Sequence, residues 1–411
     1  MGRLSRRAFA LAALATLATA PDASAVPGRR RAITGMRGVW LATVANRDWP
    51  SRPGMTAAEQ RRELIGHLDV AVRNRLNTVI FQVRPTADAL WPSPYEPWSE
   101  YLTGTQGKDP GWNPLETAVE EAHARGLELH AWFNPYRIAV HTDLTKLVAS
   151  HPARRHPDWV VAYGGKLYYN PGLPEVRAFV QRAILDAVKK YPVDAVHFDD
   201  YFYPYPVAGQ TFDDDEAYAR HGAGFPDRAA WRRDNIDRLV RETAACIRRT
   251  RPGTRFGISP FGVWRNAATD PLGSDTRAGV QTYDDLHADT RKWVRKNWID
   301  YVAPQVYWLA QPLDQQVPAN YSVLVPWWSE VVRGTGVQLY IGEALYKAGD
   351  PAQPAAWQDP AELSRHLTLA DAHTEVRGHV YFAAKDVATD RIGAMARVVA
   401  DHYQRPARVP R

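Results

Sequence analysis

The stretch from Val193 to Pro206, Val-Asp-Ala-Val-His-Phe-Asp-Asp-Tyr-Phe-Tyr-Pro-Tyr-Pro, decides how the rest of the chain is interpreted. Residues 195–198 form a short apolar run that is typical of a strand buried on both faces. Asp199 and Asp200 follow directly, and aromatic residues and prolines then end the strand. Two carboxylates at the end of a buried strand are costly unless they are paired or functional. In a parallel α/β protein that strand end is where sites form, so the pattern favours a site over loop capping or pairing with arginines.

Strand-like and helix-like segments alternate eight times around this stretch. The predicted strands are residues 38–42, 78–83, 127–133, 195–199, 255–259, 301–306, 338–341 and 379–382. The predicted helices are residues 57–73, 114–125, 174–190, 229–249, 283–296, 321–333, 360–373 and 391–402. This alternation predicts an α/β fold, a (β/α)8 TIM barrel with long insertions after its strands. A doubly wound sheet is disfavoured, because no glycine-rich dinucleotide turn follows any predicted strand.

The first 25 residues are expected to be an export signal and not part of the fold. Ser5-Arg6-Arg7-Ala8-Phe9 is a twin-arginine pattern, an apolar run follows it, and Ala23-Ser24-Ala25 offers a small-residue cleavage site. An uncleaved membrane anchor is the alternative, although the run is short for a bilayer. We therefore expect one catalytic domain over residues 33–403 and a basic tail over 404–411. The expected location is extracellular, at the cell wall or in the periplasm, with no membrane association after cleavage.

The composition argues against other classes of function. The formal net charge is +6, and lysines and arginines are spread along the chain, so nucleic acid is a poor candidate partner. The single cysteine, Cys246, cannot form an internal disulfide. The chain has 15 tryptophans and 19 tyrosines, and many of them follow predicted strands. Flat apolar faces with polar rims suit sugar rings, with core packing as the alternative.

The polar residues at strand ends point to one kind of chemistry. The sequence contains no Gly-x-Ser-x-Gly hydrolase elbow, no His-Glu-x-x-His zinc helix and no phosphate-binding glycine loop. No cofactor or metal is expected, and calcium at the acidic run 213–216 is a weaker alternative to a solvated loop. What remains is a set of carboxylates among aromatic side chains. That set fits glycosidic bond cleavage, in which one carboxyl group protonates the leaving oxygen and another attacks carbon or activates water.

We assign the catalytic roles to Asp200, Glu343 and Asp199. The two aspartates are expected to point to opposite sides of their strand, so that one faces the site and the other orients it, with Asp200 favoured as the acid. Glu343 follows the strand 338–341 and is the expected second carboxylate, with a salt bridge at the rim as the alternative. The expected substrate-binding residues are Trp40, Arg84, Trp132, Asn134, Tyr136, Tyr201, Gln305, Tyr307 and Trp308.

Six stretches of the chain resemble the family-10-like bacterial glycoside hydrolases. They are residues 37–50 (RGVWLATVANRDWP), 81–85 (FQVRP), 97–104 (PWSEYLTG), 130–137 (HAWFNPYR), 198–204 (FDDYFYP) and 304–308 (PQVYW). The resemblance implies a (β/α)8 barrel in an exported protein that acts on bacterial cell-wall glycan, namely peptidoglycan strands stripped of their peptides. The family's Asn-Pro-Tyr-Arg motif falls on Asn134 to Arg137, and its Asp-Asp-Tyr motif falls on Asp199 to Tyr201.

The sequence therefore predicts an exported glycoside hydrolase whose partner is a polysaccharide that contains N-acetylhexosamine. A non-catalytic glycan-binding barrel and a hydrolase of another extracellular polysaccharide are the alternatives. Three questions stay open at this point: retention or inversion of configuration, whether an acetamido group replaces the nucleophile, and the oligomeric state.

Overall fold

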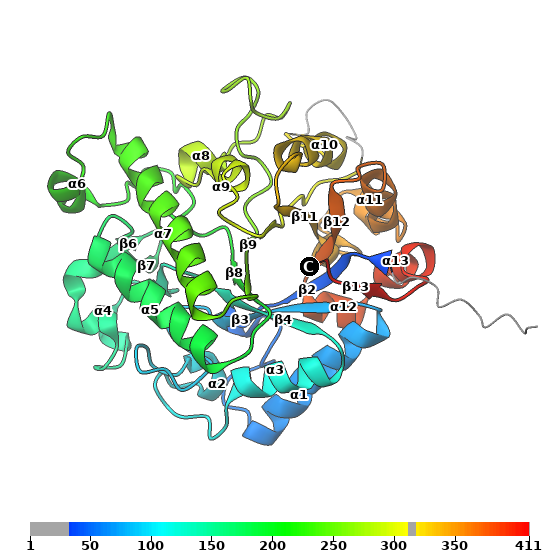
Figure 1. Ribbon diagram of the computed structural model, residues 1–411. Helices are drawn as coiled ribbons and strands as arrows, with labels where there is room; N and C mark the ends of the chain where they lie inside the picture. Colours follow the sequence, from blue (N-terminus) through cyan, green and yellow to red (C-terminus); the bar gives the residue numbers. More distant parts are fainter. Residues whose placement is uncertain (1–32, 311–317, 411) are drawn as a thin grey trace, which may run out of the picture. The chain divides into compact units, whose positions relative to one another are not determined.

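The computed structural model describes residues 33–310 and 318–410, and its centre is a closed barrel of parallel strands (Figure 1). Neighbouring strands follow one another in chain order around the barrel, as the strand–helix alternation predicts. The strands are β2 (Met36–Leu41), β3 (Thr78–Arg84), β4 (Glu128–Phe133), β8 (Ala195–Phe198), β9 (Arg255–Ile258), β10 (Tyr301–Val302), β11 (Gln338–Glu343) and β12 (Val376–Phe382). The predicted (β/α)8 fold is confirmed.

Helices cover the outside of the barrel (Figure 1). They are α1 (Ala57–Arg73), α3 (Pro114–Ala124), α5 (Pro174–Lys190), α7 (Arg228–Thr250), α8 (Thr282–Asp285), α9 (Thr290–Arg295), α10 (Tyr321–Val332), α11 (Glu362–Ala370), α12 (Ala384–Thr389) and α13 (Ala394–His402). Local sequence fixes their ends. In α1, for example, the Thr56 side chain accepts from the Glu59 backbone N–H while the Glu59 carboxylate accepts from that of Thr56.

Two predicted elements differ from the observed ones. Residues 283–296 form two short helices, because the backbone takes a left-handed conformation at His287 (φ 50°) and Asp289 caps a new helix start. The strand predicted over 301–306 is reduced to Tyr301–Val302. Pro304 lies in that stretch and has no N–H to donate to a ladder.

The insertions that follow β3, β4 and β8 contain small elements of their own. After β4, the strands β5 (Arg137–Ala139), β6 (Val160–Tyr163) and β7 (Lys166–Tyr169) form an antiparallel sheet within the predicted long insertion, where no strand was predicted. The short helices in these insertions are α2 (Glu100–Thr103), α4 (Pro152–Arg155) and α6 (Asp215–His221).

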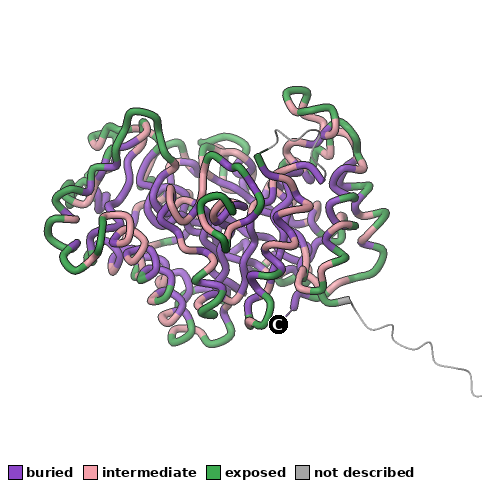
Figure 2. The backbone as a smooth tube through the Cα atoms, turned by 90° about the horizontal axis from the view of Figure 1, so that it is seen from above, coloured by how far each residue is buried: buried purple, intermediate pink, exposed green. Residues whose placement is uncertain are grey.

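Alternate residues of each strand fill the interior of the barrel. Met36, Ile80, Tyr340 and Val380 pack in this inner cluster, whereas the other strand face packs against the helices in a larger core. Figure 2 shows buried backbone through the centre and exposed backbone around it. The parity of a residue in its strand therefore decides whether its side chain enters the barrel or the helical layer.

The segment predicted to be a basic tail packs against the N-terminal end of the barrel. Its residues form β13 (Ala407–Arg408), which pairs in parallel with β1 (Ile33–Thr34). Val409 joins the inner cluster beside Met36, so this end of the barrel is closed. None of the helices within the described ranges is long and apolar enough to cross a membrane. The predicted twin-arginine signal, residues 1–25, lies outside the described residues.

Candidate active site

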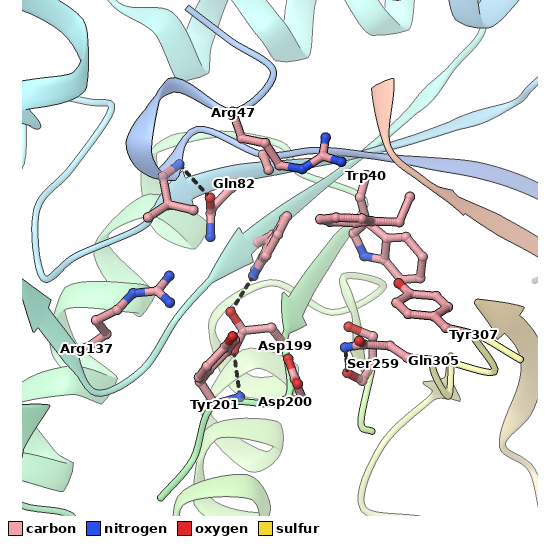
Figure 3. Close-up of a pocket in the computed structure, with 14 residues that line it drawn as sticks. Trp40, Arg47, Gln82, Arg137, Asp199, Asp200, Tyr201, Ser259, Gln305 and Tyr307 are labelled. Atoms are coloured by element: carbon pink, nitrogen blue, oxygen red, sulfur yellow. Dashed lines mark hydrogen bonds between the residues drawn. The ribbon is translucent and has the colours of Figure 1, made fainter. Parts of the chain in front are cut away.

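A cavity of about 240 Å³ opens at the C-terminal ends of the barrel strands (Figure 3). Its walls come from the ends of β2, β3, β4, β8, β9 and β12 and from the loops that follow them. The lining residues are Trp40, Ala42, Val44, Arg47, Gln82, Trp132, Arg137, Asp199, Asp200, Tyr201, Ser259, Gln305, Tyr307 and Phe382. Seven residues predicted from the sequence are among them, namely Asp199, Asp200, Trp40, Trp132, Tyr201, Gln305 and Tyr307.

Asp199 is held rigidly at the end of β8. Its Oδ2 accepts hydrogen bonds from Trp132 Nε1 (3.0 Å) and Asn134 Nδ2 (3.0 Å), and its Oδ1 accepts from the backbone N–H of Tyr201 (3.1 Å). Asp199 is 4 % exposed, so these donors replace the water molecules that a solvated carboxylate would bind. Three donors around one carboxylate leave little freedom for its position.

Asp200 lies beside Tyr205 and Gln305. The hydroxyl of Tyr205 donates to its Oδ2, and hydrogen bonding by Tyr205 and by the Gln305 side chain opposes the effect of burial on its pKa. Both aspartates line the cavity, so the expectation that they point to opposite sides is wrong. The reason is that β8 ends at Phe198, and the alternation of side chains holds only within the strand.

Burial raises the pKa of both aspartates. For Asp199 the negative charge of Asp200 raises the pKa further, while the positive charge of Arg137 lowers the pKa of each. Because the charge of one aspartate affects the other, the two carboxyl groups titrate as a pair. The pair therefore holds a proton at a higher pH than a solvated carboxyl group would, which a general acid requires.

Aromatic and cationic side chains surround the pair. Trp40, Trp132, Tyr307 and Phe382 supply flat faces, as the sequence predicted for the first three. Arg47 lies 4.4 Å above the Phe382 ring. Sugar rings stack on such faces through their C–H patches.

Four polar residues of the cavity were not in the predicted site: Arg47, Gln82, Arg137 and Ser259. Arg47 and Arg137 do fall within stretches that carry the family resemblance, and Ser259 ends a predicted strand. The side-chain oxygen Oε1 of Gln82 accepts from the backbone N–H groups of Thr43 (3.0 Å) and Val44 (2.9 Å), so Gln82 shapes the loop after β2. Gln82 lies two residues after Ile80, whose side chain enters the barrel, and this alternation along β3 would have identified Gln82 as facing the interior.

A buried histidine supports the floor of the cavity from inside the barrel. Trp40 Nε1 donates to His197 Nε2 at 3.2 Å, and the hydroxyl of Ser259 lies 2.8 Å from the same nitrogen. An indole N–H can only donate, so Nε2 accepts and the proton of His197 sits on Nδ1, 2.9 Å from the Tyr301 hydroxyl. Burial lowers the pKa of His197 well below its usual value, in agreement with a neutral ring. His197 is thus a structural histidine.

Glu343 is not at the cavity, and its predicted role as the second catalytic carboxylate is corrected. Its side chain is fully buried and accepts from the Tyr321 hydroxyl (2.9 Å), with His366 Nδ1 (2.8 Å) and His379 Nδ1 (2.9 Å) also in contact. Within β11 it shares parity with Leu339 and Ile341, which face the helical layer. Burial raises the pKa of Glu343, but His366 and then His379 outweigh it and lower the pKa to about 2.

Four predicted substrate-binding residues also lie off the cavity wall. Arg84 is fully buried in an ion pair with Glu96 (Nη2–Oε1 2.5 Å), because the register shift between Gln82 and Arg84 turns it away from the interior. Asn134 is buried behind Asp199, and Tyr136 packs in the outer core. Trp308 packs against Phe261, with ring centroids 5.5 Å apart, beyond the cavity.

The acidic run 213–216 faces arginines. Asp214 pairs with Arg232 (2.6 Å), and Arg228 pairs with Asp215. Across residues 33–310 and 318–410, no group of three or more His, Cys, Asp or Glu side chains is arranged to hold a metal ion.

Comparison with known proteins identifies relatives of this chain. The glycosyl hydrolase-like 10 family model matches residues 35–359. "Glycosyl hydrolase YngK" of Bacillus subtilis (strain 168) is 51 % identical over 377 residues, which cover 91 % of this chain and 73 % of that protein. "Glycosyl hydrolase DigH" of Escherichia coli (strain K12) is 42 % identical over 388 residues, covering 89 % of this chain and 87 % of that protein.

Solved structures agree on the fold. The glycoside hydrolase domain of PgaB (BpsB) from Bordetella bronchiseptica aligns with a TM-score of 0.56 at 13 % identity, over 89 % of this chain and 98 % of that one. At this identity the likeness concerns the fold alone. The extent of the family match and the identity to both relatives confirm the predicted glycoside hydrolase: the chain belongs to the glycosyl hydrolase-like 10 family.

Proposed function

We propose that this protein cleaves glycosidic bonds in cell-wall glycan that contains N-acetylhexosamine, specifically peptidoglycan strands without peptides, by carboxylate general acid/base catalysis. The observation that carries the proposal is the pair Asp199 and Asp200, buried in one wall of an aromatic-lined cavity with raised pKa values. The substrate class comes from the family resemblance of the sequence. The two relatives named as glycosyl hydrolases support the reaction type.

In this proposal Asp200 is the proton donor and Asp199 is its fixed partner. Asp200 lines the cavity and burial raises its pKa, so it can carry a proton to the leaving oxygen. Asp199 is surrounded by donors that stabilise its charged form, and it can orient the substrate or the acid. Water adds to the anomeric carbon as the leaving oxygen takes the proton of Asp200, and the proton of that water returns to the carboxylate pair. Since Glu343 lies elsewhere, neither residue relies on it.

The test is incubation of the purified protein with peptide-free glycan strands, with products analysed by mass spectrometry. We expect shorter strands from the wild type and a loss of at least about 100-fold in kcat for Asp200→Asn, the usual range for a general acid. Asp213→Asn is the matched control, because it makes the same change at an exposed site outside the cavity. Full activity in both Asp199→Asn and Asp200→Asn would contradict the mechanism. An uncut but tightly bound glycan would favour a binding barrel, and cleavage of a different polysaccharide alone would reject the substrate.

We also propose that the protein is exported by the twin-arginine route and acts outside the cytoplasm. The pattern Ser5-Arg6-Arg7-Ala8-Phe9 supports this proposal. Replacing Arg6 and Arg7 together by lysine should retain the protein in the cytoplasm, as measured by fractionation and immunoblotting. Unchanged export of that variant would reject the route.

A further inference from the structure

Arg137 is a buried cation of the cavity without a carboxylate partner in the part of the chain that the structure describes. It is 6 % exposed, and its Nε and Nη2 both donate to the carbonyl oxygen of Pro85, at 3.2 and 3.1 Å. Within residues 33–310 and 318–410, no acidic side chain lies within ion-pair distance of it, and Nη1 has no hydrogen-bond acceptor. The guanidinium can therefore donate further hydrogen bonds to a ligand.

Among the described residues, two other buried arginines pair with a carboxylate: Arg84 with Glu96 and Arg177 with Glu242. Arg37 is also buried without such a pair, and its guanidinium lies over the Tyr403 ring, 4.0 Å from the ring centre and outside the cavity. An unpaired buried charge is costly, so a fold keeps one only where something repays it. Arg137 lines the cavity, and Figure 3 shows its guanidinium facing the space above Asp199, across from Ser259 and Gln305.

One side chain fixes the spacing between Arg137 and the reacting carboxylates. The amide of Asn134 donates through Nδ2 to Asp199 (3.0 Å) and accepts through Oδ1 from the backbone N–H of Arg137 (2.8 Å). The guanidinium also lies 5.1 Å from the centre of the Tyr201 ring. An anion bound by Arg137 would therefore lie at a fixed distance from the glycosidic bond that the aspartates cleave.

We propose that Arg137 anchors an anion subsite that binds a carboxylate carried by the sugar at the cavity. This inference rests on the proposed function and names its specificity determinant. In peptidoglycan, the lactyl group of N-acetylmuramic acid is an amide while the peptide is attached and a free carboxylate once the peptide is removed. A planar guanidinium matches a carboxylate with two parallel hydrogen bonds, so Arg137 selects strands without peptides.

Binding to the inactive Asp200→Asn protein tests this subsite separately from hydrolysis. Peptide-free glycan fragments are compared by calorimetry with the same fragments after their lactyl carboxylates are converted to methylamides. We expect neutralisation to weaken binding about 10- to 100-fold, the range for a charge-assisted hydrogen bond. Adding Arg137→Gln should abolish that preference, and Arg137→Lys should keep part of it, because lysine retains the charge but not the paired geometry.

Arg182→Gln is the control, since that side chain is exposed and lies outside the cavity. An unchanged preference in the Arg137→Gln protein, or an equal loss of affinity for both fragments, would overturn the inference. So would a pH–rate profile displaced in Arg137→Gln with the preference intact, because Arg137 would then act only on the aspartates. If the wild type cuts no peptide-free strand, the proposed function fails, while the binding comparison still decides the subsite.

Discussion

Replacing Glu343 by glutamine separates a structural role from a catalytic one. The substitution keeps the shape of the side chain and removes its charge, which meets His366 and His379 in a fully buried site. Burial opposes the charge of Glu343, but the two histidines outweigh it and lower the pKa from 4.5 to about 2. His366 shows the reciprocal effect, since the charges of Glu343 and Glu362 raise its pKa despite burial.

The magnitude follows from this difference in pKa. At about 1.4 kcal/mol per pKa unit, a fall from 4.5 to about 2 stabilises the folded state by about 3 kcal/mol at neutral pH. Because the folded pKa of Glu343 is depressed, this stability is present above pH 4.5 and is lost as the pH falls towards 2. An unfolding entropy of about 2.1 cal/mol/K per residue over roughly 380 residues converts 3 kcal/mol into a Tm lower by about 4 °C.

The assay is thermal unfolding of wild type and Glu343→Gln at pH 7 and at pH 3.5, together with kcat/KM on glycan strands. We expect the Tm difference to narrow at the lower pH and kcat to stay within about threefold wherever the variant is folded. Glu330→Gln is the matched control, because its side chain is 70 % exposed and its loss should change Tm by less than about 1 °C. A loss of 100-fold or more in kcat/KM at an unchanged Tm would refute the structural assignment.

Three further predictions concern other parts of the molecule. Arg84→Met should destabilise the fold by about 3–5 kcal/mol, because it leaves Glu96 buried and charged, and Glu96→Gln in the same chain should restore much of the lost Tm. In Asp200→Asn, the carboxyl carbon of Asp199 should titrate by NMR at a lower pH than in the wild type, since a neighbouring negative charge is gone; an unchanged midpoint would count against the coupling. Trp40→Phe should raise KM on glycan strands about 10-fold with a smaller change in kcat, because it narrows an aromatic wall of the cavity; an unaltered KM would remove this residue from the binding surface.

Much of the fold could be predicted because strand and helix patterns in this chain are strong and regular. The strand around Val196 and the helix Pro174–Lys190 match their predicted ranges closely. The small sheet that contains Tyr168 was missed because its strands are short and its sequence resembles loop. The break at His287 depends on a left-handed backbone conformation that composition does not indicate.

The site was predicted in part. Glu343 and Arg84 were misplaced because their side chains face the helical layer and not the interior of the barrel. Glu343 ends its strand as expected, but strand ends alone do not tell whether a side chain enters the barrel. Its spacing from Ile341, a residue of the outer core, contained that information. For Arg84 parity itself misleads, because the register shift after Gln82 reverses the side-chain direction, and only the fold reveals such a shift.

The neutral imidazole of His197 lies beneath the cavity and holds the Trp40 side chain in its floor. His197 Nε2 accepts from the indole N–H of Trp40, so a second proton on this ring would break that hydrogen bond, whereas the Ser259 hydroxyl beside it could still accept. Burial lowers the pKa of His197 well below its usual value and so keeps this ring neutral. The Trp40 face that would receive a sugar is therefore held by an uncharged group, beside two carboxyl groups whose charge changes with pH.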